Sequence, residues 1–471
     1  MPSYRSLRMT GAQHGCIRRH LFPGDGKEAV AFALCGALQE HALSVHKLYP
    51  VPYDDCIMRA ADRVIWRTDV LPAMLAEAES RNLSLLKIHS HPQGFRSFSG
   101  TDDLADAELS ESVAAWLGRD RGYASAVMLP DGRIFARSID PAGAFFPIES
   151  VCVAGDDILL WKYNAIVTTG GTTSAPQPEF ARRTAQAFGQ GTTAMLGELS
   201  VAVIGCSGTG SPLVEMLARL GVRRLVLVDP DHVEEKNLNR INNATMADAR
   251  AGIAKVEVMA RAIRAMGLGT IVEPVAASLS SSGVVQRVAT CDVVFGCMDS
   301  VDGRDLLNRL ATFYCLPYID VGVRLAADGA GGVDQICGTV NYLQPGGSSL
   351  LSRGAYTASD IQAAALRRES PERYATLLRE KYIAGVQEER PAVISVNTFY
   401  ASLAVNELLA RLHPYRDDGN GDFASYGISL TQARIIAARE DEPCLTLARH
   451  VGRGDVRPLL NMPELSEGSE A

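Results

Sequence analysis

The stretch VAVIGCSGTGS, residues 201–211, joins a short apolar run to a glycine-rich turn. Such a run is typical of a buried parallel strand, and the apolar spacing of SPLVEMLARLG (211–221) predicts that a helix begins at the turn. Backbone amides and the N-terminus of that helix can hold a phosphate. The turn alone does not choose among NAD, FAD, S-adenosylmethionine, ATP and a tight turn without a ligand.

Further strands alternate with helical segments beyond this turn. The apolar runs are RRLVLVDPD (223–231), CDVVFGCMD (291–299) and LPYIDVGV (316–323). This alternation predicts a doubly wound, Rossmann-like α/β sheet. A charged helical insert is expected over 360–384 and an amphipathic-to-apolar helix over 391–412.

The first 150 residues follow a different pattern, with short apolar runs separated by turns. Helical spacing covers 70–82 and 102–117, so this part is expected to be a compact α+β unit. The stretch TTGGTTSAPQP (168–178) is rich in Thr, Gly and Pro and marks a boundary. The predicted organisation is a first domain over 1–165, a linker over 166–179, a second domain over 180–462 and an acidic disordered tail over 463–471.

Composition narrows the class of protein. The chain has 471 residues, 47% of them hydrophobic and 21% charged, as in multidomain globular enzymes. It has no apolar run of membrane-spanning length, and its first residues lack the apolar segment of a secretory signal, so no membrane association and a cytoplasmic location are expected. Ten cysteines without a C-x-x-C pair argue against a disulfide framework. The net charge of -8 argues against nucleic acid as a partner.

The stretch KIHSHPQGFRSFSGTDD, residues 87–103, sets two histidines, a serine and an aspartate at short intervals. His89 and His91 share one face of a strand and can reach the same metal. Asp102, at the start of the next helix, can add a third ligand and leave a fourth position for water, as catalytic zinc requires. A nearby carboxylate would carry the proton of that water, and Ser99 would stabilise an oxyanion. The structural alternative is a pair of hydrogen-bonded histidines near a turn.

The spacing H-x-H-x₇-S-x₂-D resembles the signature of the JAMM (JAB) metalloproteases. That family carries its catalytic glutamate upstream, in a context that KEAVAFALCG matches at Glu28. The resemblance implies an α+β, cytidine-deaminase-like fold. It implies that His89, His91 and Asp102 bind Zn²⁺, that Glu28 is the general acid and base, and that Ser99 assists the oxyanion. The implied reaction is hydrolysis of an amide or isopeptide bond after a ubiquitin-like C-terminus.

Polar residues after the glycine turn indicate which ligand it takes. Asp229, at the end of the second strand, can accept hydrogen bonds from ribose hydroxyls. Arg240 and Lys255 add cations that a dinucleotide dehydrogenase does not need. Asp299, at the end of a later strand, can hold Mg²⁺ against a triphosphate. Together these residues favour ATP over NAD.

In order and spacing, these blocks resemble the ThiF/MoeB family, the adenylating domain shared with ubiquitin-activating enzymes, over about 180–325. The resemblance implies that a ubiquitin-like C-terminal carboxylate attacks the α-phosphate of ATP while Lys255, Arg240 and Mg²⁺ offset the charge. Arg183 resembles the arginine that reaches the nucleotide of the partner subunit in dimers of this family, and its neighbour Arg182 is the alternative. The implied ATP and magnesium ligands are Gly205, Gly208, Gly210, Asp229, Asp231, Asn237, Arg240, Lys255 and Asp299.

The chain departs from this family after the sheet. Family members hold a structural zinc with two C-x-x-C pairs, and many add a thioester-forming cysteine nearby. Here Ser349 and Ser352 stand at the first pair, and the second pair keeps Cys444 but has Leu447. No structural zinc is therefore expected. A smaller departure is Ser207, which replaces the middle glycine of the turn.

The transfer nucleophile is also missing from its usual place, because no cysteine lies between Cys337 and Cys444. Three explanations stay open. Ser349 or Ser352 forms an ester in place of a thioester, the enzyme stops at the adenylate, or Cys337 substitutes. Cys337 is the weakest candidate, since its surroundings resemble a strand and strand cysteines are usually buried in the core.

The two halves together resemble bacterial ThiF-family adenylyltransferases with an N-terminal JAB domain. This implies a ubiquitin-like modifier protein as substrate of both sites, a conjugating-enzyme-like protein as partner, and a homodimer formed through the adenylation domain. The first interpretation is protein tagging in antiviral defence or stress signalling, with the protease half maturing a precursor tail or reversing conjugation. The alternatives are activation of a sulfur carrier for cofactor or amino-acid synthesis, and a scaffold that only presents modifier tails to the protease.

Overall fold

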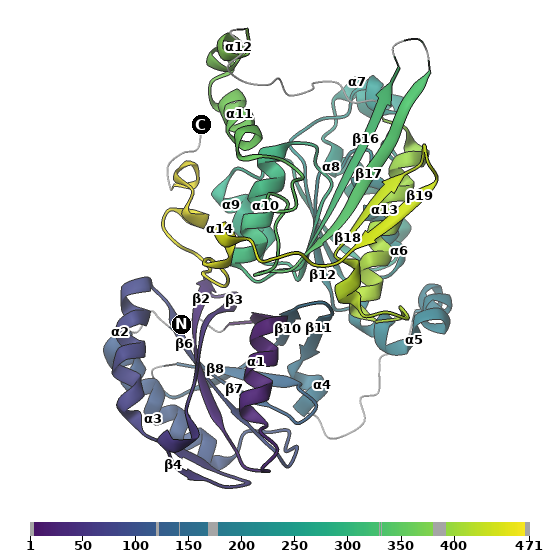
Figure 1. Cartoon of the computed structure of the whole chain (residues 1–471). Coiled ribbons are helices and arrows are strands. Elements are labelled where there is room, and N and C mark those ends of the chain that lie inside the picture. The colour runs from purple at the N-terminus through teal and green to yellow at the C-terminus, as the bar shows by residue number, and fades with distance from the viewer. Residues whose placement is uncertain are drawn as a thin grey trace. The chain divides into compact units, whose positions relative to one another are not determined.

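The computed structural model of the chain describes residues 4–118, 122–140, 142–167, 178–328, 330, 332–379 and 392–466. They form two compact units (Figure 1). The first unit comprises Met1–Pro176, Thr312–Cys315 and Arg449–Pro463, and the second comprises Gln177–Ala311, Leu316–Ala448 and Glu464–Ala471. Most of the predicted linker (166–179) and the end of the acidic tail (467–471) lie outside the described residues. No helix in the described ranges combines the length and apolar character needed to cross a bilayer.

The first unit is built on a nine-stranded mixed sheet with the order β11-β10-β1-β3-β2-β6-β7-β8-β9. β1 runs parallel to β10 and β3, and β6 runs parallel to β7, whereas the other neighbours are antiparallel. A separate pair is formed by β4 (Cys56–Arg59) and β5 (Val64–Trp66). The strands of the large sheet are β1 (Ser6–Thr10), β2 (Val30–Leu38), β3 (Ala42–Pro50), β6 (Ser84–Ser90), β7 (Tyr123–Met128), β8 (Ile134–Ile139), β9 (Phe145–Ile148), β10 (Ser150–Ala154) and β11 (Ile158–Lys162).

Helices cover both faces of this sheet (Figure 1). α1 (Gly11–Leu21) lies on one face, and α2 (Leu71–Arg81) and α3 (Gly100–Leu117) lie on the other, where the sequence predicted two helices. Because successive side chains of a strand point to opposite faces, β2 contributes to two separate cores. Ala31, Ala33 and Cys35 pack with α1, while Val30, Phe32 and Leu34 pack with α2 and α3. A short α4 (Tyr163–Val167) follows β11.

Residues 449–463 belong to the first unit, although the sequence analysis assigned them to the second domain. Their backbone bonds to the C-terminal part of β2. Gly36 N–H donates to the carbonyl of Gly452 at 3.0 Å, and Asp455 N–H donates to the carbonyl of Ala37 at 2.7 Å. Hydrogen bonds between main-chain groups do not depend on residue type, so the sequence could not show that residues 449–463 belong to the first unit. The adjoining Pro463–Leu465 forms a 3-10 turn with Leu465 buried, so the predicted disordered tail begins as ordered chain.

The second unit contains an eight-stranded sheet with the order β14-β13-β12-β15-β16-β17-β18-β19. Its first five strands are parallel, as expected for a doubly wound fold, and the last three are added antiparallel. The α/β prediction for this half is therefore confirmed. The strands are β12 (Ser200–Ile204), β13 (Arg224–Val228), β14 (Ile271–Val275), β15 (Val293–Gly296), β16 (Tyr318–Ala327), β17 (Val333–Leu343), β18 (Ser425–Ser429) and β19 (Arg434–Ala438).

One parallel strand, β14, was not recognised in the sequence. It contains Pro274, and proline argues against a central strand because it cannot donate to the ladder. β14 lies at the edge of the sheet and pairs only with β13, where a missing donor is tolerated.

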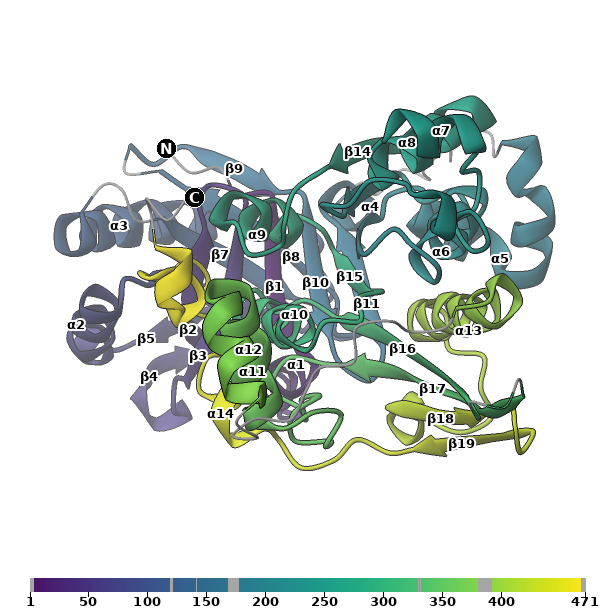
Figure 2. The same ribbon diagram turned by 90° about the horizontal axis from the view of Figure 1, so that it is seen from above.

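The helices of the second unit lie on both faces of its sheet (Figures 1 and 2). α6, α8 and α13 cover one face, with α13 beside α6, and α9 and α10 cover the other. α11 and α12 form the described part of the predicted charged insert. The bounds are α5 (Arg182–Leu196), α6 (Gly210–Arg219), α7 (Met246–Ala251), α8 (Lys255–Met266), α9 (Ser282–Ala289), α10 (Val301–Phe313), α11 (Ala358–Glu369), α12 (Pro371–Arg379), α13 (Ile394–Leu412) and α14 (Leu445–Ala448).

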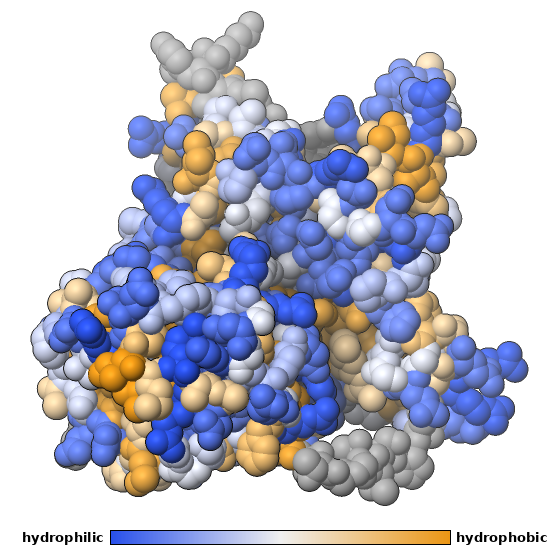
Figure 3. Space-filling model, turned by 60° about the horizontal axis from the view of Figure 1, so that its bottom comes forward, coloured by the Kyte–Doolittle hydropathy of each residue, from blue (hydrophilic) through white to orange (hydrophobic). Residues whose placement is uncertain are grey.

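Exposed apolar side chains of the first unit lie on different elements. Ile57, Met58 and Ile65 belong to the β4–β5 pair, and Leu104 is on α3. On the face drawn in Figure 3, hydrophobic residues form separate patches among hydrophilic ones. That face therefore resembles the mixed surface of an ordinary globular protein.

His46 should make the first unit sensitive to acid. Its Nδ1 lies 2.6 Å from the carbonyl of Val451, and burial lowers the pKa of His46 to about 4. Because the unfolded chain takes up this proton near pH 6.5, stability should fall as the pH drops from 6.5 towards 4. His46→Asn keeps a donor and removes the titration. Between pH 7.5 and 5, we expect the melting temperature of the variant to fall less than that of wild type. The two decreases should differ by about 2–4 °C if the free energies of unfolding differ by about 1 kcal/mol. Identical pH profiles in a circular dichroism melt would contradict this.

Candidate functional site

The two histidines of the first unit lie where β6 runs into the loop before α3. Their Nε2 atoms are 3.2 Å apart, because side chains two positions apart in a strand share a face. Asp102, in the first turn of α3, brings Oδ1 to 3.1 Å from Nε2 of His89 and Oδ2 to 3.7 Å from Nε2 of His91. The three residues predicted to bind zinc therefore converge.

Hydrogen bonds around the imidazoles determine which nitrogens face this point. Nδ1 of His91 lies 2.8 Å from the carbonyl oxygen of Phe95, which only accepts. Nδ1 of His91 therefore carries the proton, and its Nε2 presents a lone pair to the cluster. His89 is 2% exposed, and its Nδ1 has no hydrogen-bond partner among the described residues. An imidazole lone pair aimed at a second imidazole and a carboxylate suits a cation between them.

Ser99 and Asp102 form a capping box at the start of α3. Ser99 Oγ accepts from the N–H of Asp102 at 3.1 Å and donates to its Oδ2 at 2.7 Å, and Oδ2 also accepts from the N–H of Ser99 at 2.7 Å. Burial raises the pKa of Asp102, but the adjacent imidazoles of His89 and His91 and the N–H of Ser99 outweigh this and hold the pKa well below its usual range. Ser99 thus fixes the carboxylate in this structure, a role the sequence analysis did not assign to it.

Glu28 lies two residues before the start of β2 and is 6% exposed. The antiparallel register pairs Val30 with His89, and continuing it by two residues places Glu28 opposite His91. Burial raises the pKa of Glu28 to about 7. A carboxyl group that titrates near neutrality can both take up and release a proton during a reaction.

The residues present fit a zinc ion. Two imidazole nitrogens and one carboxylate oxygen lie within 4.8 Å of one another. Within the part of the chain that the structure describes, no second trio of His, Cys, Asp and Glu donors meets in this way. Two histidines and one carboxylate form a common three-ligand set for catalytic zinc, with a fourth position left for water or substrate.

The glycine turn of the second unit joins β12 to α6 and leaves no room for side chains at three positions. A Cβ on Gly205, whose φ is +90°, would lie 2.7 Å from the carbonyl oxygen of Cys297. A Cβ on Gly210 would lie 1.8 Å from the carbonyl oxygen of Gly205, and one on Gly208 would lie 2.2 Å from Asn397 Nδ2. The turn therefore presents backbone N–H groups and the N-terminus of α6, which together suit a phosphate.

Asp229 and Lys255 brace this turn. Asp229 Oδ2 accepts from the N–H of Cys206 at 2.7 Å, and Oδ1 accepts from the N–H of Asp231 at 2.9 Å. Lys255, the first residue of α8, donates to Asp231 at 2.7 Å and lies 3.9 Å from Asp229. Burial raises the pKa of Asp229, and the Lys255 ammonium opposes that rise. Asp229 therefore ties the turn to β13, with further lone pairs left for a ribose hydroxyl.

The other predicted nucleotide residues differ in exposure. Asn237 is buried, and its Oδ1 accepts from the N–H of Glu234 at 3.1 Å. Arg240 is half-buried, with Cδ 3.4 Å from the Cβ position at Gly208. Asp299, in the loop after β15, and Arg183, on α5, are exposed. The alternative to Arg183, Arg182, pairs with Glu179 at 3.1 Å.

Asn397 of α13 was missed in the sequence. It is 4% exposed and faces Gly208 from a helix that is otherwise mostly apolar on its buried side. The polar Asn397 within an otherwise apolar helix could have indicated a role, because buried polar groups need hydrogen-bond partners.

Two segments meet where the family's zinc ligands would stand. Cys444 N–H donates to the carbonyl of Gly347 at 3.0 Å. Ser349 is 1% exposed, and its Oγ accepts from the N–H of Ser352 at 3.0 Å. A hydroxyl that is buried and hydrogen-bonded in this way is poorly placed to attack an adenylate. Cys337, in β17, is half-buried.

An ion-pair cluster joins the same two segments. Glu440 accepts from the N–H of Ser348 at 2.7 Å and from Arg353 Nη2 at 3.1 Å. Arg353 also donates to the carbonyls of Tyr342 and Ala424, at 3.0 Å each. These contacts hold the two segments together.

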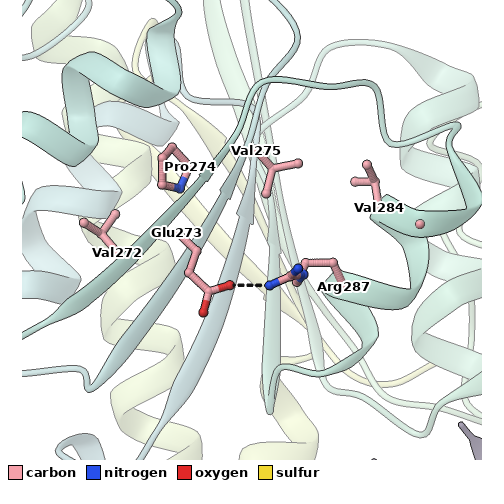
Figure 4. Close-up of a pocket in the computed structure, with 7 residues that line it drawn as sticks. Val272, Glu273, Pro274, Val275, Val284 and Arg287 are labelled. Carbon is pink, nitrogen blue, oxygen red and sulfur yellow. Dashed lines mark hydrogen bonds and ion pairs between the residues drawn. The ribbon is translucent and has the colours of Figure 1, made fainter.

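A pocket lies between β14 and α9 (Figure 4). Glu273 and Arg287 face each other in it at 2.9 Å, and Glu273 also accepts from Arg224 at 2.7 Å. None of the predicted nucleotide residues lines this pocket, and the paired charges already satisfy each other. Its lining is Val272, Glu273, Pro274, Val275, Gly283, Val284 and Arg287.

A model of the ThiF family matches residues 180–444, more than half of the chain. Among curated proteins, the chain is similar to the SAMP-activating enzyme E1 of Haloferax volcanii, with 38% identity over 119 residues, 25% of this chain and 43% of that protein. It is 40% identical to the adenylyltransferase and sulfurtransferase MOCS3 of Sus scrofa over 113 residues, 24% of each chain. It is 26% identical to the ubiquitin-like modifier-activating enzyme 5 of Drosophila mojavensis over 185 residues, 36% of this chain and 43% of that protein. The chain spans less than half of the length of each of these relatives.

Among solved structures, the chain is similar to E. coli MccB with ATP. The sequence identity is 17% and the TM-score is 0.43, over 57% of this chain and 74% of that chain.

Gly210→Ala should weaken nucleotide binding, because its Cβ would displace the backbone of the turn. Distortions of this kind cost about 1–3 kcal/mol, so we expect the ATP affinity measured by calorimetry to fall about tenfold or more. The matched control is Gly191→Ala in α5, where an added Cβ meets nothing within 4 Å. Equal ATP affinities for the two variants would contradict the assignment of the turn.

Proposed function

Because this chain belongs to the ThiF family, we propose that its second unit uses ATP and Mg²⁺ to adenylate the C-terminal carboxylate of a ubiquitin-like or sulfur-carrier protein. The family match and the sterically closed glycine turn support this. One carboxylate oxygen attacks the α-phosphorus, the bond between the α-phosphorus and its bridging oxygen breaks, and pyrophosphate leaves with an acyl adenylate formed.

The residues of the turn take separate roles in this reaction. The N–H groups from Ser207 to Gly210 hold the phosphates, and Lys255 and Arg240 offset the charge that grows on the pentacoordinate phosphorus. Lys255 must release Asp231 to do so, which its flexible stem permits. Asp231 and Asp299 supply the hard oxygen ligands that Mg²⁺ prefers. In a homodimer, Arg183 would reach the nucleotide of the partner subunit.

We also propose that the first unit is a zinc hydrolase of the JAMM type. The observation that carries this is the convergence of His89, His91 and Asp102 beside a buried Glu28 whose pKa is raised towards neutrality. Bound Zn²⁺ would make the attacking water more acidic and polarise the scissile carbonyl. Glu28 takes the proton of that water and delivers it to the leaving amine, while the oxygen of the water bonds to the carbonyl carbon and the C–N bond breaks. The N–H of Ser99 keeps Asp102 in place, and its hydroxyl would turn away from Asp102 to donate to the oxyanion.

The two activities share one substrate class, the flexible tail of a small modifier. The hydrolase would expose or release the tail, and the adenylating unit would activate it for a conjugating-enzyme-like partner in protein tagging, for defence or stress signalling. Linkage in one chain raises the effective concentration of the tail at the second site. The buried, hydrogen-bonded Ser349 is disfavoured as a transfer nucleophile, which leaves Ser352, Cys337 or an enzyme that stops at the adenylate.

Delivery of the adenylate to a sulfur donor is the second candidate, favoured by the similarity to MOCS3. An isopeptide-linked acceptor recovered with the modifier would support tagging, and a C-terminal thiocarboxylate on the modifier would support sulfur transfer. A chain that binds the modifier without exchanging pyrophosphate would be a scaffold instead.

Lys255→Ala should reduce modifier-dependent ATP–pyrophosphate exchange by about 10²–10³-fold, because a charge contact made in the transition state is lost. Lys236→Ala is the control, since Lys236 is exposed and pairs with Glu234 at 3.0 Å. The same exchange rate in both variants would rule out the role given to Lys255.

Glu28→Gln should abolish tail cleavage, by about 10²–10⁴-fold, while zinc content measured by mass spectrometry stays at the wild-type level. The substitution keeps the size of the side chain and removes its proton transfer. Glu40→Gln, in an exposed turn after β2, should leave both quantities unchanged. Zinc loss in the Glu28 variant would make Glu28 a ligand and not the base.

A further inference from the structure

We propose that a buried ion cluster of Lys87, Asp106 and Arg137 positions Asp102 for metal binding. The inference rests on the zinc site proposed above and concerns residues outside it. None of the three is a predicted ligand, and none touches the substrate. They are positioning residues that act through α3.

The cluster lies between the sheet and α3 of the first unit. Asp106 has no exposed surface, and Lys87 and Arg137 are 6% and 5% exposed. Lys87 Nζ forms an ion pair with Asp106 Oδ1, and Arg137 Nη2 lies 2.7 Å from Asp106 Oδ2. Tyr123 Oη donates to Asp106 Oδ1 at 3.1 Å. Both carboxylate oxygens of a fully buried aspartate are thus held by groups of the sheet.

The ion cluster and the proposed zinc ligands share two elements, β6 and α3. The cluster lies two residues away from the ligands along β6 and one turn away along α3. Lys87 precedes His89 by two residues in β6, which separates them by about 6.6 Å on the same face. Asp106 follows Asp102 by four residues in α3, about 6 Å along the same side of the helix. The two pairs, His89 with Asp102 and Lys87 with Asp106, therefore lie in register. A helix that slid or rotated would break both pairs together.

Arg137 extends this restraint to the start of α3. Its Nη1 lies 2.5 Å from Oδ1 of Asp103, the residue after Asp102. Its guanidinium carbon also lies 3.7 Å from the ring centre of Phe98 and 4.0 Å from that of Phe145. Phe98 directly precedes Ser99, so one guanidinium holds the end of the loop and the first turn of the helix that together carry the capping box.

The chemistry of the cluster also favours a positioning role. Removing several charges from water is costly, and apolar residues of similar size would often give equal or greater stability. Ion pairs accept few geometries, whereas apolar contacts tolerate sliding. Lys87 and Arg137 of the sheet, paired with Asp106 of α3, therefore fix the register of this helix.

The test is zinc affinity of the full-length protein, measured by competition with a chromophoric chelator. We expect Asp106→Asn to weaken zinc binding about 10–100-fold, the usual range for groups that orient metal ligands. Val113→Ala is the matched control, because Val113 is 1% exposed on α3 and packs into the core away from the cluster. It should lower the melting temperature and leave the zinc affinity unchanged.

Cobalt substitution gives a spectrum that does not change when a variant is only less stable. The visible d–d bands of the Co²⁺ form should change in Asp106→Asn and stay as in wild type in Val113→Ala. If Asp106→Asn does not fold, Arg137→Lys keeps the charge and should show a smaller change of the same kind. Wild-type affinity and spectrum in the cluster variants would overturn the inference while leaving the zinc site standing. A wild-type protein that takes up no zinc would overturn the site itself.

Discussion

The alternation of side chains along buried strands governs the first unit. In β6, Leu86 and Ile88 enter the core beneath α1, while Lys87 and His89 face α3. Because both faces are covered, a shift of one residue would drive two charged or polar groups into an apolar core. The hydrophobic pattern therefore fixes the register, and the register brings the imidazoles to Asp102.

The second unit depends on a different constraint. The turn after β12 packs so closely against neighbouring backbone that side chains have no room there. Here the atoms that would contact the proposed phosphate belong mostly to the main chain, so side chains nearby serve to hold the turn. Asp229 bonds to it from β13, and Asn397 faces it from a helix nearly 200 residues later in the chain. Rigid main-chain donors lose little entropy when a phosphate arrives.

The sequence predicted the residues of the candidate sites better than the residues that hold those sites in place. Motif spacing predicted that His89, His91 and Asp102 converge and that a tight glycine turn follows β12, because both patterns need particular residues at short intervals. Lys87 and Asp106 gave no such signal, since their pairing depends on how a helix lies over a sheet. Pro274 concealed an edge strand, and the main-chain bonds of Gly452 left no trace in composition. What could not be predicted is in each case a contact between distant parts of the chain.

The return of residues 449–463 to β2 makes the first unit discontinuous in sequence. During synthesis, the early strands leave the ribosome long before the segment that pairs with them, although domains usually fold from the N-terminus onward as they are made. The C-terminal end of β2 must therefore wait until residues 449–463 have been made. A nascent chain stalled before residue 449 would therefore carry a first unit that lacks one of its own segments.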